Sequence, residues 1–373
     1  MALTLFLAGC GAMVPRTAPP RVAPPPPAKH QPAPSLPEDR LRHRVALLVP
    51  LSGPNGAVGQ SIANAATLAL ADTKDHSLRL TTYDTATGAA AAAQRALADG
   101  NRLFLGPLLG EDVKAVSGPA EAAGVPVIAF SNDVSAAGKD VWLLGFQPSQ
   151  SVERVIRYAR SRGLSRFAAL MPQGEYGRSA STAMIHAVED AGGSVVAMQS
   201  YARNSDSLGA AVVAIGKQKY DAVMVADSGR IVVHALPLIR KHGGAGARLL
   251  GTELWNAEPG LNKVPDMAGA WFASVDDAMF EQLAARYRGR YGRTPYRLAS
   301  LGYDAVLLAV RIAADWKPDA PFPVDRLDDD AGFSGVDGAF RFDGDHIAER
   351  ALAVHQIGPD GGLVISPAPK GFR

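Results

Sequence analysis

The sequence is poor in cysteine, with one, Cys10, in 373 residues. A single cysteine cannot form an internal disulfide or supply a zinc cluster of thiolates. An excess of charge of one sign is also missing, because 38 basic and 36 acidic residues leave a formal net charge of +2. Lysine and arginine are scattered along the chain, so nothing in their pattern predicts a nucleic-acid partner.

Signatures of catalysis and of cofactor binding are absent as well. The segment from Gly177 to Ser181 begins like a nucleophile elbow but lacks the final glycine of Gly-x-Ser-x-Gly. The segment from Gly244 to Gly246 lacks the third glycine of a dinucleotide fingerprint and precedes a predicted strand. The histidines do not form pairs at the helical spacing typical of a zinc site. We therefore predict no catalytic residue, no metal site and no cofactor, and a protein that is not an enzyme.

The segment Leu-Ala-Gly-Cys, from Leu7 to Cys10, resembles a bacterial lipobox. The apolar run before Cys10 is far shorter than the roughly 20 residues that span a bilayer. The resemblance implies that residues 1–10 hold a lipoprotein signal and that Cys10 is lipidated. The alternative is a buried core cysteine. Because no charged residue precedes Cys10, as a signal peptide requires, we expect the natural chain to begin further upstream.

Residues 11–40 are rich in proline, which removes backbone donors and stops helices. At about 3.1 Å per residue, such a spacer reaches up to about 90 Å when extended. We predict a disordered tether, with an ordinary disordered N-terminus as the alternative. Together with Cys10 it predicts a periplasmic protein that meets the membrane only through its lipid anchor. Gly11, where a resemblance to known lipoproteins would put aspartate for inner-membrane retention, favours the outer membrane.

The rest of the chain alternates short apolar runs with longer segments of helical period. About 330 residues exceed the size at which one core stops growing, so two lobes are expected. The expected strands are 44–49, 78–83, 103–105, 125–130, 167–171, 195–201, 222–226, 249–251 and 351–357. The expected helices are 58–72, 88–99, 110–123, 151–162, 178–191, 208–217, 231–242, 279–291 and 298–316. This alternation predicts an α/β fold of two Rossmann-like lobes with parallel sheets.

Small and polar residues follow several of the predicted strands. In an open parallel sheet, ligands bind beyond the carboxyl ends of the strands, where helix N-termini present free N–H groups. The residues at these ends are Ser52, Gly53, Gly106, Pro107, Ser131, Asn132, Asp227 and Ser228. The same residue types are ordinary turn formers, which leaves a second interpretation open for each loop. We predict that these residues line a ligand-binding cleft.

The order and spacing of several segments resemble the type I periplasmic binding proteins of the leucine/isoleucine/valine-binding class. The segments are 45–60, 83–84, 106–107, 124–128, 175–177 and 335–342. The resemblance implies two lobes joined by three crossings around an interlobe cleft, the first from 41–146 and 271–316, the second from 147–270 and 317–373. It also implies that Tyr176 packs on a ligand and that Glu253 pairs with the ligand's ammonium group.

Two acids, near Glu111 and Asp133, stand where the resemblance implies groups that hold a ligand carboxylate. Carboxylates within about 4 to 6 Å of a bound carboxylate repel it. We therefore expect any ligand to be a small amine-bearing molecule other than a free α-amino acid.

Further segments are similar to lipoproteins called penicillin-binding protein activators. They are residues 130–133, 144–146, 250–255, 297–304 and 333–338. This resemblance implies a non-enzymatic regulator that docks on a peptidoglycan synthase. The alternative is a substrate-binding receptor that delivers an amino acid or related small solute to an ABC permease. The long tether and the altered carboxylate grip favour the regulator.

Overall fold

Two main sheets organise the computed structural model, which describes residues 42–258, 260–369 and 372. The first sheet is parallel, in the order β2-β1-β3-β4-β5. Its strands are β1 (His43–Val49), β2 (Leu78–Asp84), β3 (Leu103–Leu105), β4 (Val127–Ala129) and β5 (Val141–Leu143). The helices between them are α1 (Gly56–Thr73), α2 (Ala89–Ala98) and α3 (Gly110–Ala122), and the turn η1 (Val134–Ala136) precedes β5.

The second sheet runs in the order β15-β14-β10-β9-β8-β6-β7, parallel except at β14 and β15. Its strands are β6 (Arg166–Pro172), β7 (Ser194–Tyr201), β8 (Ala222–Val225), β9 (Arg248–Gly251), β10 (Trp271–Ser274), β14 (Ala353–Gly358) and β15 (Gly361–Ser366). The helices are α4 (Pro148–Ser161), α5 (Glu175–Asp190), α6 (Ser205–Ile215) and α7 (Gly229–Ile239), which continues as a π turn, η2 (Arg240–Gly244). Three short turns follow β9, namely η3 (Glu253–Trp255), η4 (Leu261–Lys263) and η5 (Pro265–Met267).

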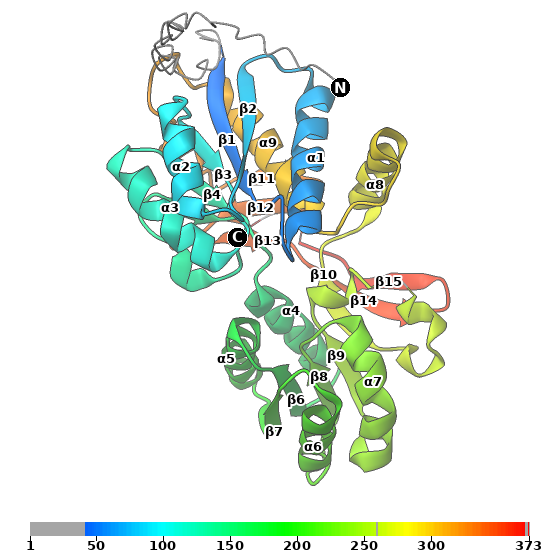
Figure 1. Ribbon diagram of the computed structural model, residues 1–373. Helices are drawn as coiled ribbons and strands as arrows, with labels where there is room; N and C mark the ends of the chain where they lie inside the picture. The colour runs from blue at the N-terminus through cyan, green and yellow to red at the C-terminus, as the bar shows by residue number, and fades with distance from the viewer. Residues whose placement is uncertain (1–41, 259, 370–371, 373) are drawn as a thin grey trace, which may run out of the picture. The chain divides into compact units, whose positions relative to one another are not determined.

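A third, small antiparallel sheet completes the first lobe (Figure 1). It comprises β11 (Phe333–Gly335), β12 (Gly338–Phe342) and β13 (Ala348–Arg350), after the helices α8 (Ala278–Tyr291) and α9 (Ala299–Ala313) and the turn η6 (Val324–Arg326). Phe333, Phe340 and Phe342 belong to the same core cluster as β1 and α9. Lobe 1 is therefore residues 43–143 and 278–350, and lobe 2 is residues 148–274 and 353–366.

Strand alternation explains why these apolar runs are continuous. In β1, Val45, Leu47 and Val49 pack into one core with α1 and α9, whereas Ala46 and Leu48 face α2 and α3 on the other side of the sheet. Successive strand residues point to opposite faces, so a parallel strand covered by helices on both sides is apolar throughout. The predicted α/β fold of two lobes with parallel sheets is confirmed.

Two predicted lobe boundaries are wrong. Residues 271–274 were assigned to the first lobe, but they form β10, which pairs with β9 and β14 of lobe 2. Residues 317–350 were assigned to the second lobe, but the aromatic residues of β11 and β12 complete the core of lobe 1. The chain thus crosses between the lobes at residues 144–147, 275–277 and 351–352. Cys10 and the tether 11–40 lie outside the described residues.

Candidate functional site

A cavity of about 470 Å³ lies between the lobes, at the carboxyl ends of β1, β3 and β4. Its wall is largely apolar. The lining residues of lobe 1 and the first crossing are Asn55, Val58, Leu108, Leu109, Phe130, Asn132, Phe146, Tyr296, Arg297 and Leu298. Those of lobe 2 and the second crossing are Glu253, Leu254, Asn256, Ala257, Ser274 and Val275. A cavity of this size and polarity suits a small organic molecule.

Glycines bring the loops of lobe 1 close enough together to form this wall. Gly106 has φ +89°, and a Cβ on it would lie 2.1 Å from the carbonyl oxygen of Leu48. A side chain at this position would push the β3–α3 loop away from β1. The absence of a Cβ therefore places Leu108 and Leu109, which follow directly, at the cavity wall.

On the opposite wall, Glu253 begins the turn η3. The indole of Trp255 anchors this turn by donating from Nε1 to the carbonyl oxygen of Asp227, 3.0 Å away. Gly251 leaves room for that indole, because a Cβ there would lie 2.2 Å from the ring. The position of Glu253 is thus fixed by buried contacts on lobe 2.

Two hydroxyl groups hold the Glu253 carboxylate. Tyr176 donates to Oε1 at 2.9 Å, and Ser151 donates to Oε2. Because the single proton of the Tyr176 hydroxyl goes to Glu253, the Thr252 hydroxyl, 2.8 Å away, donates to Tyr176. Burial raises the pKa of Glu253, and the two hydroxyl hydrogen bonds lower it in part. Burial and the charge of Glu253 raise the pKa of Tyr176 well above its usual range.

Two of the ten predicted cleft residues, Asn132 and Glu253, line the cavity. Tyr176, predicted to pack on a ligand, contacts Glu253 from behind and is not part of the wall. It therefore acts on a ligand only through the carboxylate that it holds.

Asp227 and Ser228 serve the internal structure of lobe 2. Asp227 is 2% exposed and accepts hydrogen bonds from the Tyr201 hydroxyl at 2.8 Å and from Arg203 at 3.0 and 3.2 Å. Ser228 precedes α7, and its backbone N–H donates to Asp227. The structure thus favours the turn interpretation for this loop.

The remaining predicted cleft residues support loops near the cavity without lining it. Ser52 donates to Asp84 at 3.3 Å, next to Gly53, which has φ +68°. Gly106 and Pro107 are the buried first residues of the β3–α3 loop. Ser131 is 3% exposed and accepts a hydrogen bond from the backbone N–H of Asp133 at 3.0 Å.

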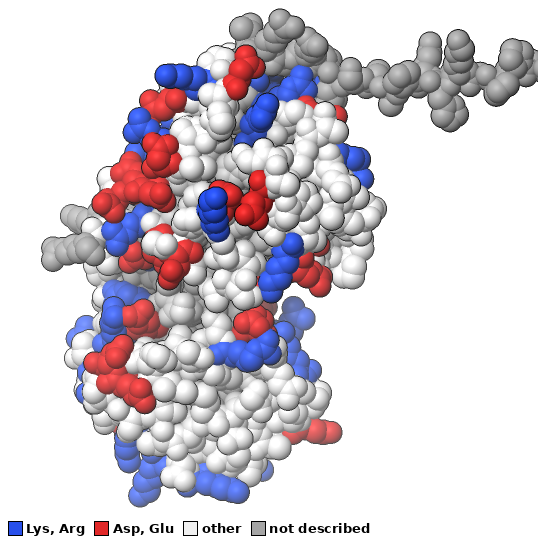
Figure 2. All heavy atoms as spheres, turned by 90° about the vertical axis from the view of Figure 1, so that its left-hand side faces the viewer, with Lys and Arg blue, Asp and Glu red and all other residues white. Residues whose placement is uncertain are grey.

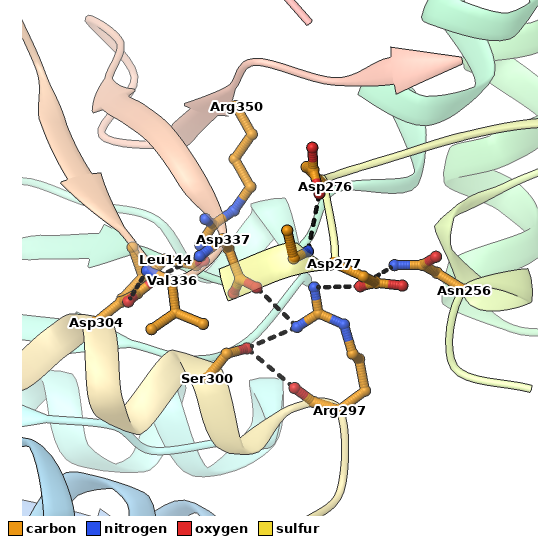
Figure 3. Close-up of polar contacts among 11 residues, drawn as sticks. Leu144, Asn256, Asp276, Asp277, Arg297, Ser300, Asp304, Val336, Asp337 and Arg350 are labelled. Carbon is orange, nitrogen blue, oxygen red and sulfur yellow. Dashed lines mark hydrogen bonds and ion pairs between the residues drawn. The ribbon is translucent and has the colours of Figure 1, made fainter. Parts of the chain in front are cut away.

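Arg297 is a cavity residue that the sequence analysis did not select. Its Nη1 donates to Asp337 at 2.7 Å and to the Ser300 hydroxyl at 3.0 Å (Figure 3). Its Nη2 lies 3.4 Å from Asp277, and the guanidinium stacks 4.2 Å above the Phe280 ring. Arg297 begins the segment 297–304, which carries a family resemblance. That resemblance is the sequence signal that could have identified Arg297.

The charges behind Arg297 connect the first two crossings with the end of β13, which leads into the third. Arg350, at the end of β13, donates to the carbonyl oxygen of Leu144 on the first crossing at 2.8 Å. Asp277, on the second crossing, accepts a hydrogen bond from Asn256 at 2.7 Å in addition to its ion pair with Arg297 (Figure 3). Asp337, which is fully buried, lies within this set. The cavity wall and the crossings therefore share one buried polar network.

Asp304 of α9 extends this network into the core. Its carboxylate accepts hydrogen bonds from the backbone N–H groups of Val336 at 2.6 Å and of Asp337 at 3.2 Å. Burial, followed by the nearby charge of Asp337, raises the pKa of Asp304 to about 7, whereas Arg350 lowers it in part. Burial lowers the pKa of Arg350, opposed by both acids.

Basic and acidic side chains are interspersed on the face that Figure 2 shows, so neither sign of charge dominates there.

Within the described ranges no group of three or more histidine, cysteine or acidic side chains is placed to hold a metal ion. In the same part of the chain, no helix is long and apolar enough to cross a membrane.

Comparison with protein families identifies the chain. Residues 43–362 match the periplasmic binding protein family. The chain belongs to this family. The periplasmic binding proteins are non-enzymatic, so the prediction that the chain is not an enzyme is confirmed.

Solved structures of binding proteins share this fold at low sequence identity. The chain is similar to a substrate-binding protein of Sphaerobacter thermophilus (TM-score 0.73, 18% identity, 88% of this chain and 98% of that one). It is also similar to LivJ of Streptococcus pneumoniae in complex with isoleucine (TM-score 0.66, 18% identity, 87% and 100%). A third is a Rhodopseudomonas palustris BisB5 solute-binding protein in complex with 3,4-dihydroxy benzoic acid (TM-score 0.69, 19% identity, 88% and 96%).

Among curated proteins, the chain is 26% identical over 170 residues to a protein of Rickettsia prowazekii (strain Madrid E). The match covers 45% of this periplasmic binding protein and 46% of the relative. The chain thus spans less than half the length of that relative.

Proposed function

We propose that this periplasmic binding protein is the solute-binding component of an ABC transporter, which captures a small, largely apolar amine and delivers it to a permease. The observation that carries the proposal is the Glu253 carboxylate on the cavity wall. Among the described residues, its side-chain partners are Ser151 and Tyr176, and both are neutral hydroxyl groups. A buried carboxylate without a cation is costly, and an ammonium group of a ligand would offset that cost.

The shape of the cavity supports the apolar part of the ligand. Leu108, Leu109 and Phe130 of lobe 1 face the site across from Leu254 and Val275. An alkyl or aromatic group between these side chains would be removed from water by both lobes. Each square ångström of apolar surface so buried contributes about 25 cal/mol.

The sequence alone favours a regulator of peptidoglycan synthesis over this function. The interlobe cavity and the likeness to transporter binding proteins now favour the transporter component. The lipid anchor at Cys10 remains part of the proposal, because a tethered receptor would stay near its permease in the periplasm.

The test is binding of small amines by residues 41–373 and by a Glu253→Gln variant. A ligand at a hundred times its Kd stabilises the folded state by about 2.7 kcal/mol, which thermal unfolding detects as a shift of a few degrees. Calorimetry on the ligands found should show an affinity loss of about 10- to 150-fold in Glu253→Gln, from the 1.5–3 kcal/mol of a hydrogen bond to a charged group.

Glu175→Gln is the matched control, because Glu175 is exposed at the start of α5 and does not line the cavity. It should bind as the unchanged protein does. Equal affinity of Glu253→Gln and the unchanged protein for every amine that binds would remove the proposed role of the carboxylate. Stimulation of a purified peptidoglycan synthase, without binding of any small solute, would favour the regulator instead.

A further inference from the structure

The charged groups of lobe 1 decide which charged ligand groups the cavity can accept. We infer that the ligand carries no carboxylate, so that the cavity prefers apolar amines over the α-amino acids of the same side chain. This inference rests on the proposed function, because it concerns the ligand end opposite to Glu253.

The start of α3 is the place on lobe 1 where an anion would be expected to bind. The helix begins at Gly110, directly after the cavity residues Leu108 and Leu109. Free N–H groups and the helix dipole make such a start attractive to carboxylates.

The protein's own acids already occupy the surroundings of this helix start. Asp133 packs against Gly110 so closely that a Cβ on Gly110 would lie 2.6 Å from the carboxylate Oδ2. Glu111 and Asp112 lie in the first turn of the helix itself. Asp133 and the two acids of the first turn thus bring three negative charges to the start of α3, and a ligand carboxylate there would be repelled.

Lys114 offsets part of this negative charge. Lys114 lies 3.0 Å from Asp133, with half of its side chain exposed. Burial raises the pKa of Asp112, and the charge of Glu111 raises it further. Burial also raises the pKa of Asp133, but the Ser135 and Lys114 contacts outweigh it and the net shift is downward, so Asp133 holds its negative charge.

Arg297 lines the cavity, but its positive charge is already paired with acids of the protein. Asp337 and Asp277 both flank its guanidinium. The other polar groups of the lobe 1 wall, such as Asn55 and Asn132, are neutral. A ligand carboxylate would therefore find no unmatched positive charge on lobe 1, among the residues that line the cavity.

Matched pairs of compounds test this inference directly. Calorimetry would compare leucine with 3-methylbutylamine, and phenylalanine with 2-phenylethylamine, on the folded domain, residues 41–373. In each pair the apolar group and the amine are kept, and the carboxylate is removed. We expect at least one amine to bind tenfold or more tightly than its amino acid, a difference of about 1.4 kcal/mol.

The Asp133→Asn variant tests whether the charge of Asp133 causes the preference for amines. Asparagine keeps the size of the side chain and an acceptor for Ser135, but it removes the charge and with it the ion pair of Lys114. The preference for the amine should shrink at least threefold in this variant. Glu121→Gln is the control, because Glu121 is exposed at the far end of the same helix, and it should leave the preference unchanged.

The outcomes separate the inference from the proposed function. Amino acids that bind as tightly as their amines, or more tightly, would overturn the inference and leave the solute-binding function in place. An amine preference that Asp133→Asn does not alter would also overturn the assigned cause. Absence of binding by all these amines and amino acids would overturn the proposed amine-binding function itself.

Discussion

Asp304 is expected to make the stability of the protein depend on pH in a direction opposite to that of an acid whose pKa is lowered by an ion pair. It is 1% exposed, and its pKa in the folded state is raised to about 7. In the unfolded chain the group has its ordinary value of about 3.9. Between these values the folded state binds more protons than the unfolded state, so the free energy of unfolding falls as the pH rises.

The magnitude follows from the difference between the two pKa values. A difference of about three units corresponds to about 4 kcal/mol at most, at 1.36 kcal/mol per unit. The loss begins near pH 4 and is complete above about pH 7. For about 330 residues with an unfolding entropy of about 2.1 cal/mol/K each, this equals about 6 °C in Tm at most.

Asp304→Asn isolates this contribution. Asparagine resembles the protonated acid in shape, so it carries no charge at any pH. It gives up one acceptor for the N–H groups of Val336 and Asp337, which lowers the Tm by an amount that does not depend on pH. The groups that face Asp304 are Asp337 and Arg350, and both remain in the variant.

The assay is thermal unfolding, followed by circular dichroism, from pH 4 to pH 8.5. The Tm of Asp304→Asn minus that of the unchanged protein should rise by several degrees across this range, mostly between pH 4 and pH 7. Asp325→Asn, at an exposed position, should show a flat difference. A flat difference for Asp304→Asn as well would refute the reasoning, whatever its absolute value.

Three further outcomes are expected. Gly106→Ala should lower the free energy of unfolding by about 2 kcal/mol or more, because the backbone has φ +89° and the new Cβ would lie 2.1 Å from the carbonyl oxygen of Leu48. An unchanged denaturant midpoint would contradict this. Asp227→Ala should cost about 1–3 kcal/mol by leaving the buried Tyr201 hydroxyl without its acceptor, yet ligand affinity measured by calorimetry should stay the same. Cys10→Ser should release the protein from the membrane fraction, because a tether without acyl chains inserts no apolar area, and continued sedimentation with membranes would count against the lipid anchor.

The sequence by itself determined the class of fold, because the apolar patterns that predict strands and helices are local. The run at 45–49 is apolar at every position, which is typical of a strand covered on both faces, and the helices α1 and α4 to α6 lie within a few residues of where their period placed them. Glu253 was also found from sequence, since it stands directly after a buried strand and within a segment that carries the family resemblance.

Tertiary structure decided the lobe boundaries and most of the cavity wall. β10 is four residues long and takes its place from pairing with β9 and β14, which no local pattern records. Asp227 follows a strand as a ligand residue would, but Tyr201 at the end of β7 and Arg203 just after it bind it internally. Arg297 lines the cavity because it is held by acids 20 residues before it and 40 residues after it, and such distant pairs are set by packing alone.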